Sequence, residues 1–80
     1  MEPTIKSPLP GTFYRRPNPQ ADPYVNEGDV VKEGAVVGLI EIMKSFHEIH
    51  SDAEGRVARF LVANEDLVDA GQDIIELEPL

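Results

Sequence analysis

Lysine, histidine and carboxylate side chains are the first groups to consider for chemistry in this chain, because it has no cysteine and no serine in a nucleophile-elbow pattern. The two histidines, His47 and His50, are three residues apart in a segment with the character of a strand. Residues three apart in a strand point to opposite faces, so this pair is not expected to bind a metal together. The many carboxylates lie in turns and along strands, and no pair of them is singled out for acid–base catalysis. We therefore expect neither a catalytic residue nor a metal site.

Lys44 stands out because it lies between two segments that can pair with each other, residues 39–42 and 45–49. A two-residue loop at Met43-Lys44 would place Ile42 opposite Ser45, Glu41 opposite Phe46 and Ile40 opposite His47. Such loops prefer Asn-Gly or Asp-Gly, so Met-Lys is a poor choice for the backbone and indicates that function selected these residues. A long, exposed lysine amine suits attachment of a group through a stable amide. The competing interpretation is an ordinary solvated turn residue.

The composition indicates one small domain. The chain has 80 residues, of which 41% are hydrophobic, and no cysteine is available to stabilise the fold through disulfides. No apolar run reaches 18 residues, and the first residues lack the apolar core of a signal peptide. A formal charge of −8 argues against nucleic acid or an anionic membrane as a partner. The chain is expected to be soluble and cytoplasmic.

Short apolar runs rich in valine and isoleucine predict an all-β fold. The clearest runs are residues 36–40, 55–62 and 74–77, and none continues a helical pattern over three turns. Gly28 and Gly34 lie in acidic segments that are expected to form tight turns.

An internal repeat divides the chain into two similar halves. A shift of 37 residues superposes Val25 on Val62, Asp29 on Asp66, Val31 on Val68, Gly34 on Gly71 and Ile40 on Leu77. Upstream, Ser7 and Gly11 match Ser51 and Gly55 at a shift of 44. The first half therefore contains about seven extra residues, and these must lie between Gly11 and Val25. Ile40 and Leu77, as matching positions, are predicted core residues.

The extra residues fall in a proline-rich segment, residues 15–23. Its members are Arg15, Arg16, Pro17, Asn18, Pro19, Gln20, Ala21, Asp22 and Pro23. Three prolines exclude a regular strand and stiffen the loop. We interpret the segment as a functional protrusion, with an ordinary long loop as the alternative.

The motifs around Lys44 resemble the biotinyl domain of biotin carboxyl carrier proteins. The stretch Glu41-Ile42-Met43-Lys44-Ser45 is similar to the family signature Glu-Ala-Met-Lys-Met, in which the lysine carries biotin. Residues 7–14, Ser-Pro-Leu-Pro-Gly-Thr-Phe-Tyr, resemble the family's Ser-Pro-Met-Val-Gly-Thr-Phe-Tyr opening, and residues 49–57 resemble its turn into the second half. Residues 15–23 resemble the protruding thumb of the bacterial acetyl-CoA carboxylase carriers, and we call them the thumb.

The resemblance implies a fold, a cofactor and partners. The fold would be a flattened barrel of two four-stranded antiparallel sheets with quasi-twofold symmetry, formed by residues 1–80 as a single domain. Biotin would be joined to Lys44 by a biotin protein ligase, loaded by a biotin carboxylase and emptied by a carboxyltransferase, most readily that of an acetyl-CoA carboxylase. The chain itself would be a carrier without catalytic activity. Glu41 and Met43 would help the partner enzymes to recognise the hairpin, and the thumb would contact the biotin.

Two departures from the family signature leave alternatives open. Ile42 adds bulk before the Met-Lys pair, and Ser45 removes an apolar side chain after it. The first alternative is a lipoyl domain, although such domains usually place Asp before the lysine and have no thumb. The second is an unmodified β interaction module. The initial Met1 is compatible both with a stand-alone carrier and with a domain from a longer chain.

Overall fold

The strands of the computed structural model follow the short apolar runs of the sequence. The structure describes residues 3–80, and the strands in this range are β1 (Thr4–Lys6), β2 (Gly11–Tyr14), β3 (Val30–Val31), β4 (Val36–Ile42), β5 (Ser45–His50), β6 (Gly55–Phe60), β7 (Leu67–Val68) and β8 (Asp73–Glu78). Within residues 3–80 there is no helix long and apolar enough to cross a membrane.

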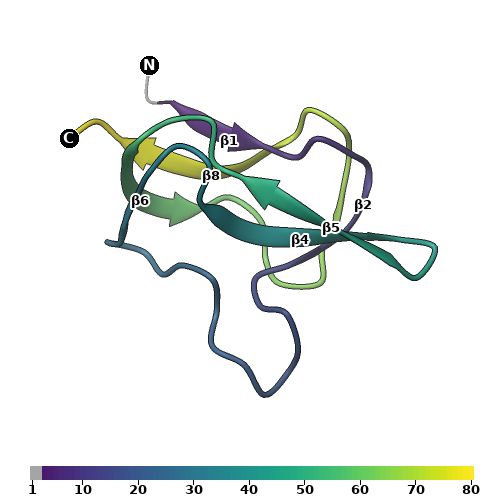
Figure 1. Ribbon diagram of the computed structural model, residues 1–80. Coiled ribbons are helices and arrows are strands. Elements are labelled where there is room, and N and C mark those ends of the chain that lie inside the picture. Colours follow the sequence, from purple (N-terminus) through teal and green to yellow (C-terminus); the bar gives the residue numbers. More distant parts are fainter. Residues whose placement is uncertain (1–2) are drawn as a thin grey trace.

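The strands form two four-stranded antiparallel sheets (Figure 1). One sheet has the order β1-β8-β6-β3, and the other has the order β5-β4-β2-β7. Strands at the same position in the two orders are counterparts in the sequence repeat: β1 and β5, β8 and β4, β6 and β2, and β3 and β7. The predicted fold class, an all-β flattened barrel with quasi-twofold symmetry, is confirmed.

The symmetry extends to the turns that close the barrel. Gly34 and Gly71 both have left-handed backbones, with φ of 90° and 81°. The Gly34 amide donates to the Ser51 carbonyl at 2.7 Å, and the Gly71 amide donates to the Ser7 carbonyl at 2.8 Å. The Ser7 and Ser51 hydroxyls each donate to the carbonyl two residues later, at 2.6 Å in both halves. The two sequence shifts, 37 and 44 residues, therefore both arise from the single quasi-twofold symmetry of the barrel.

The core lies between the sheets and is built from both halves. Ile40 of β4 and Leu77 of β8 are both completely buried, as the repeat predicted. Phe13 of β2 is also completely buried and packs near the ring of Phe60, with 6.4 Å between ring centroids. Because the core residues come from strands that are far apart in the sequence, their packing fixes the position of β2 relative to β4. Those two strands lead into the thumb and into the Lys44 hairpin.

The run predicted over residues 55–62 is longer than the strand that forms. β6 ends at Phe60, and the chain then bends so that β7 can pair with β2 in the other sheet. Leu61 is consequently 42% exposed although it belongs to the same apolar run. A hydrophobic run does not reveal where a strand must leave its sheet.

Candidate functional site

The β4–β5 hairpin carries Lys44 at its apex. The pairs Ile42 with Ser45, Glu41 with Phe46 and Ile40 with His47 form as predicted, with Met43 and Lys44 as the two-residue loop. This is the longest pair of adjacent strands among residues 3–80, and its tip projects beyond the rest of the barrel (Figure 1). The register therefore presents Lys44 at an extremity of the molecule.

Both loop residues have left-handed backbones. The φ angle is 49° at Met43 and 69° at Lys44. Two consecutive positive φ angles are typical of the type I′ turn, which matches the twist of the flanking strands and favours Asn-Gly. A side chain in this conformation costs roughly 1 kcal/mol. Met43 is 93% exposed, so burial of its side chain does not offset that cost. Folding thus gives no reason for Met-Lys at this position.

A cluster of Tyr14, Glu41 and Phe46 lies on the outer face of the hairpin's sheet. Phe46 is directly opposite Glu41, and Tyr14 is the diagonal neighbour of Glu41 on the adjacent strand. The Tyr14 hydroxyl donates to Glu41 Oε1 at 2.9 Å, and its ring centroid lies 6.1 Å from that of Phe46. The hydrogen bond to Glu41 raises the pKa of Tyr14 above its ordinary value, and burial and the charges of Glu41 and Glu65 add to the effect.

The thumb leaves the sheet directly after β2 and forms a long loop beside the hairpin's sheet (Figure 1). The base of this loop is closed by the Tyr24 amide, which donates to the Arg15 carbonyl at 2.9 Å. The Arg15 amide donates to Asn64 Oδ1 at 2.8 Å, and the Arg15 guanidinium lies 3.9 Å from the centroid of the Phe60 ring. Arg15 therefore anchors the loop to the second half of the chain.

The distal part of the thumb has local order of its own. Asn18 Oδ1 accepts from the Gln20 amide at 3.0 Å, and the Asn18 carbonyl accepts from the Ala21 amide at 3.1 Å. The first bond forms an Asx turn over residues 18–20, and the second closes a β-turn over residues 18–21. Pro17 and Pro19 fix φ on both sides of the asparagine. The loop is thus held in shape without strand pairing.

A pocket of about 530 Å³ separates the thumb from the hairpin. Residues 16–19 form one wall, Tyr14 and Phe46 provide aromatic surface, and Asn64 and Glu65 come from the β6–β7 turn. Arg16 Nε is buried in this region and has no hydrogen-bond partner among the described residues. The Arg16 Nη1 group donates to the Ala21 carbonyl at 3.5 Å. The pocket therefore combines aromatic surface with the side chain of an arginine and a carboxylate.

The structure brings part of the predicted site together. Glu41 is joined to the pocket through Tyr14, and residues 16–19 of the thumb line the pocket. Residues 20–23 do not line it, and Arg15 is directed to Phe60. Sequence reasoning missed Tyr14, Phe46, Asn64 and Glu65 as lining residues. For Glu65 a signal existed, because the repeat superposes it on Gly28.

The two histidines of β5 are exposed and have different neighbours. His47 is paired with Ile40, whereas His50 Nδ1 lies 2.9 Å from the Gly34 carbonyl and its Nε2 lies 3.4 Å from a Glu48 oxygen. In the part of the chain that the structure describes, no three His, Asp or Glu side chains are grouped so that they could hold a metal ion.

Comparison with known proteins assigns the chain that carries this hairpin to one family. A family model described as biotin-requiring enzyme matches residues 3–77. The chain belongs to this family. Among curated relatives of the family, it is 44% identical over 75 residues to the biotin carboxyl carrier protein of acetyl-CoA carboxylase from Porphyra purpurea. It is 40% identical over 73 residues to the protein of the same name from Chlamydia trachomatis. These matches cover 94% and 91% of this chain but 48% and 44% of the relatives, so the chain spans about half their length.

Solved structures share the fold. A single-chain, multi-domain long-chain acyl-CoA carboxylase superposes with a TM-score of 0.79 at 23% identity, over 99% of this chain and 7% of the other. The urea carboxylase of Kluyveromyces lactis superposes with a TM-score of 0.78 at 26% identity, over 98% of this chain and 6% of the other. In both cases this fold corresponds to a small part of a much larger polypeptide.

Proposed function

We propose that this chain is the biotin-bearing domain of a biotin carboxyl carrier protein, with Lys44 as the attachment residue. The observation that carries the proposal is the position of Lys44 at the apex of a projecting type I′ hairpin, in a turn whose residues folding did not select. The family match and the printed names of the relatives support it. The chain is a carrier, and the chemistry belongs to the enzymes that it visits.

In the attachment step, a biotin protein ligase would activate the biotin carboxyl group with ATP as an acyl-adenylate. Lys44 Nζ would then displace AMP from it and form the amide. That ligase would recognise Glu41 and Met43. The hairpin holds the lysine backbone in a fixed place while the side chain moves freely. A fixed origin and a mobile arm are what a group needs in order to reach more than one enzyme.

The pocket between the thumb and the hairpin fits a biotin head group. Bound biotin supplies a ureido nitrogen that accepts and gives up a carboxyl group. The ureido ring is a compact polar group fused to an apolar ring, and the pocket is lined by the polar side chains of Arg16 and Asn64 beside the rings of Tyr14 and Phe46. Phe46 is two residues after Lys44, about 7 Å along a strand. We propose that the thumb receives the head group of the lysine arm in this pocket.

Acetyl-CoA carboxylase is the carboxylase that we propose for this carrier. The support is the printed name shared by the relatives, together with the thumb-like loop between β2 and β3. The partners would then be a biotin carboxylase and a carboxyltransferase. Co-purification from the native host tests this assignment, because a carboxyltransferase of another specificity in the complex would contradict it.

Intact mass of the protein from its native host tests the attachment site. We expect an addition of one biotinyl group, which Lys44→Arg abolishes. The matched control is Lys32→Arg, because Lys32 is another exposed lysine of a turn and its replacement should leave the addition in place. An unmodified wild-type chain, or an addition of the size of a lipoyl group, would exclude biotin as the cofactor.

A further inference from the structure

Glu65 occupies a position that the other half of the barrel fills with glycine. The backbone φ is 72° at Glu65 and 95° at Gly28, its counterpart at a shift of 37 residues. The two amides make equivalent bonds, from Gly28 to the Val57 carbonyl at 2.7 Å and from Glu65 to the Phe13 carbonyl at 2.6 Å. The same turn is thus built twice, and its left-handed backbone favours glycine in both places.

The contacts of Glu65 within the fold do not explain the glutamate. Its side chain is exposed, and among residues 3–80 its carboxylate takes part in none of the salt bridges or side-chain hydrogen bonds. The turn around Gly28 forms without a side chain, and no atom lies within 4 Å of the position that a Cβ would occupy there. A side chain kept in a disfavoured conformation without a structural partner points to a role outside folding.

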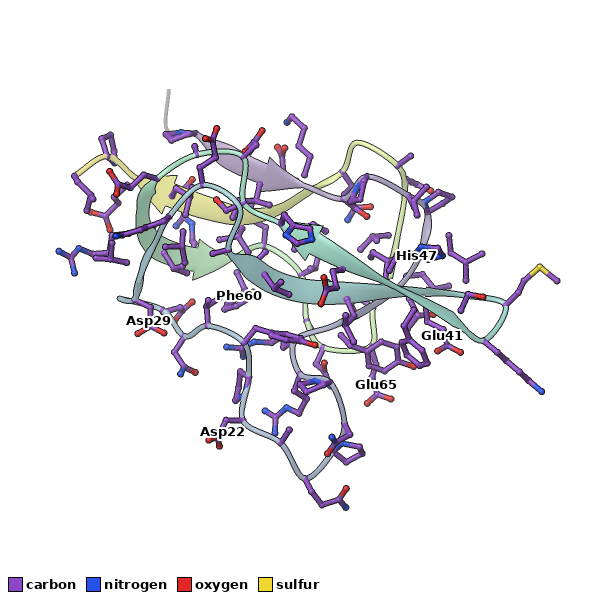
Figure 2. The ribbon with its side chains drawn as sticks, viewed as in Figure 1. Asp22, Asp29, Glu41, His47, Phe60 and Glu65 are labelled. Atoms are coloured by element: carbon purple, nitrogen blue, oxygen red, sulfur yellow. The ribbon has the colours of Figure 1, made fainter. Side chains whose placement is uncertain are left out.

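The surroundings of Glu65 suggest what that role is. Glu65 lines the same pocket as Arg16, and its charge contributes to the raised pKa of Tyr14. Figure 2 shows the labelled Glu65 between Glu41, which belongs to the hairpin, and the loop that contains Asp22. The thumb wall of the pocket contains the Arg16 side chain, and the β6–β7 turn presents a carboxylate acceptor. A ring that carries an N–H would satisfy that acceptor.

We propose that Glu65 is a binding residue for the ureido ring of the biotinyl group, with its carboxylate accepting a ring N–H. This proposal rests on the function proposed for Lys44 and adds a residue outside the thumb and the hairpin to the site. An N–H bonded to a carboxylate is stronger than a neutral hydrogen bond. A lipoyl dithiolane has no N–H, so the same pocket would not hold that group through Glu65.

The experiment compares the unmodified and biotinylated domain by NMR, in the wild type and in Glu65→Gln and Glu65→Gly. Intact mass first establishes that each sample carries biotin, so a failure of the attachment proposal is seen before docking is measured. In the wild type, biotinylation should shift the backbone amide signals of Arg16, Phe46 and Asn64. Glu65→Gly should reduce the docked population roughly fivefold to tenfold. Glu65→Gln keeps an acceptor and should retain an intermediate population.

Thermal unfolding separates binding from folding. Glu65→Gly places glycine in a left-handed position, so its melting temperature should equal or exceed that of the wild type while docking is lost. The matched control is Gly28→Glu, which introduces the same side chain at the symmetric turn. The neighbouring Asp29 lies at the opposite end of the molecule from the hairpin tip in Figure 2. This control should lower the melting temperature and leave the docking shifts unchanged. Biotinylation shifts that are absent in the wild type, or identical in Glu65→Gly, would overturn the proposal.

Discussion

The Tyr14 hydroxyl donates a 2.9 Å hydrogen bond to Glu41 Oε1, and this bond joins the strand that leads into the thumb to the strand that leads to Lys44. The two residues are diagonal neighbours on the outer face of the sheet, and the ring of Phe46 lies on the other side of Glu41. The acidic residue of the family signature therefore has a structural partner in the opening motif. Two segments that the sequence presents as separate motifs meet in one contact.

Because of this hydrogen bond, the stability of the fold should depend on pH through the ionisation of Tyr14. The hydroxyl donates only when it is protonated, so its folded-state pKa is raised above the ordinary 10.0. Its stabilising effect is complete below pH 10.0 and is lost as the pH rises through the raised value. Glu41→Gln should lower the pKa of Tyr14 toward the ordinary value. Ultraviolet titration in a Tyr24→Phe background measures it, and an unchanged midpoint would show that the charge of Glu41 is not the cause.

Ile40 and Leu77 predict a symmetric effect on stability. Each is completely buried, and the two occupy equivalent positions in β4 and β8. Ile40→Ala and Leu77→Ala should each lower the free energy of unfolding by roughly 2–5 kcal/mol, measured by urea denaturation. Leu67→Ala is the control because Leu67 is 81% exposed, and its effect should stay within about 0.5 kcal/mol. A small effect at only one of the two core sites would show that the halves do not share the core equally.

The fold and the position of Lys44 at a hairpin apex could be predicted from the sequence because both leave signals in it. Val31 and Val68, or Gly34 and Gly71, repeat at a constant shift, and a poor turn pair such as Met43-Lys44 conflicts with its own flanking strands. The pocket left no local signal. It joins residues from the thumb, from β5 and from the β6–β7 turn, and only the three-dimensional pairing of β2 with both β4 and β7 brings these together. Glu65 was visible in the repeat only as a mismatch with Gly28, and a mismatch does not show what the side chain faces.

At the hairpin apex, a residue that stabilises the turn is expected to weaken recognition by the ligase. Met43 has a φ of 49° and is 93% exposed, so asparagine should suit the backbone better at this position. Met43→Asn should raise the free energy of unfolding by about 0.5–1 kcal/mol. The same change should slow biotinylation of Lys44, which intact mass follows over time with purified ligase. Ser45→Asn, on β5 beside the turn, serves as a control for a general effect of asparagine. Unchanged modification kinetics in Met43→Asn would remove Met43 from the recognition site.

The β1–β8 edge predicts a loss of stability in acid. Lys6 and Thr4 both donate to Asp73, and their hydrogen bonds hold the pKa of that carboxyl below its ordinary 3.8. A lowered folded-state pKa contributes stability above the ordinary value, and this contribution is lost as the pH falls through the lowered value. Asp73→Asn should therefore be less stable than the wild type near neutral pH, and the difference should shrink below pH 3.8. Thermal unfolding across this range measures it. A difference that is constant with pH would assign the effect to packing instead of charge.

Deletion of most of the thumb should impair function without loss of the fold. The second half of the barrel connects β6 to β7 with a much shorter segment, so a short connection is compatible with this topology. The base of the thumb is closed by the bond from the Tyr24 amide to the Arg15 carbonyl, which lies outside the stretch from Arg16 to Asp22.

Deletion of that stretch should leave cooperative unfolding and biotinylation of Lys44 intact, because the core and the hairpin are untouched. Carboxyl transfer in the complex assembled with biotin carboxylase and carboxyltransferase should fall, because the deletion removes one wall of the pocket. Replacement of Gln20 by Ala, outside the pocket lining, is the control and should transfer normally. Normal transfer by the deletion variant would reduce the thumb to a long loop without a role in the carrier cycle.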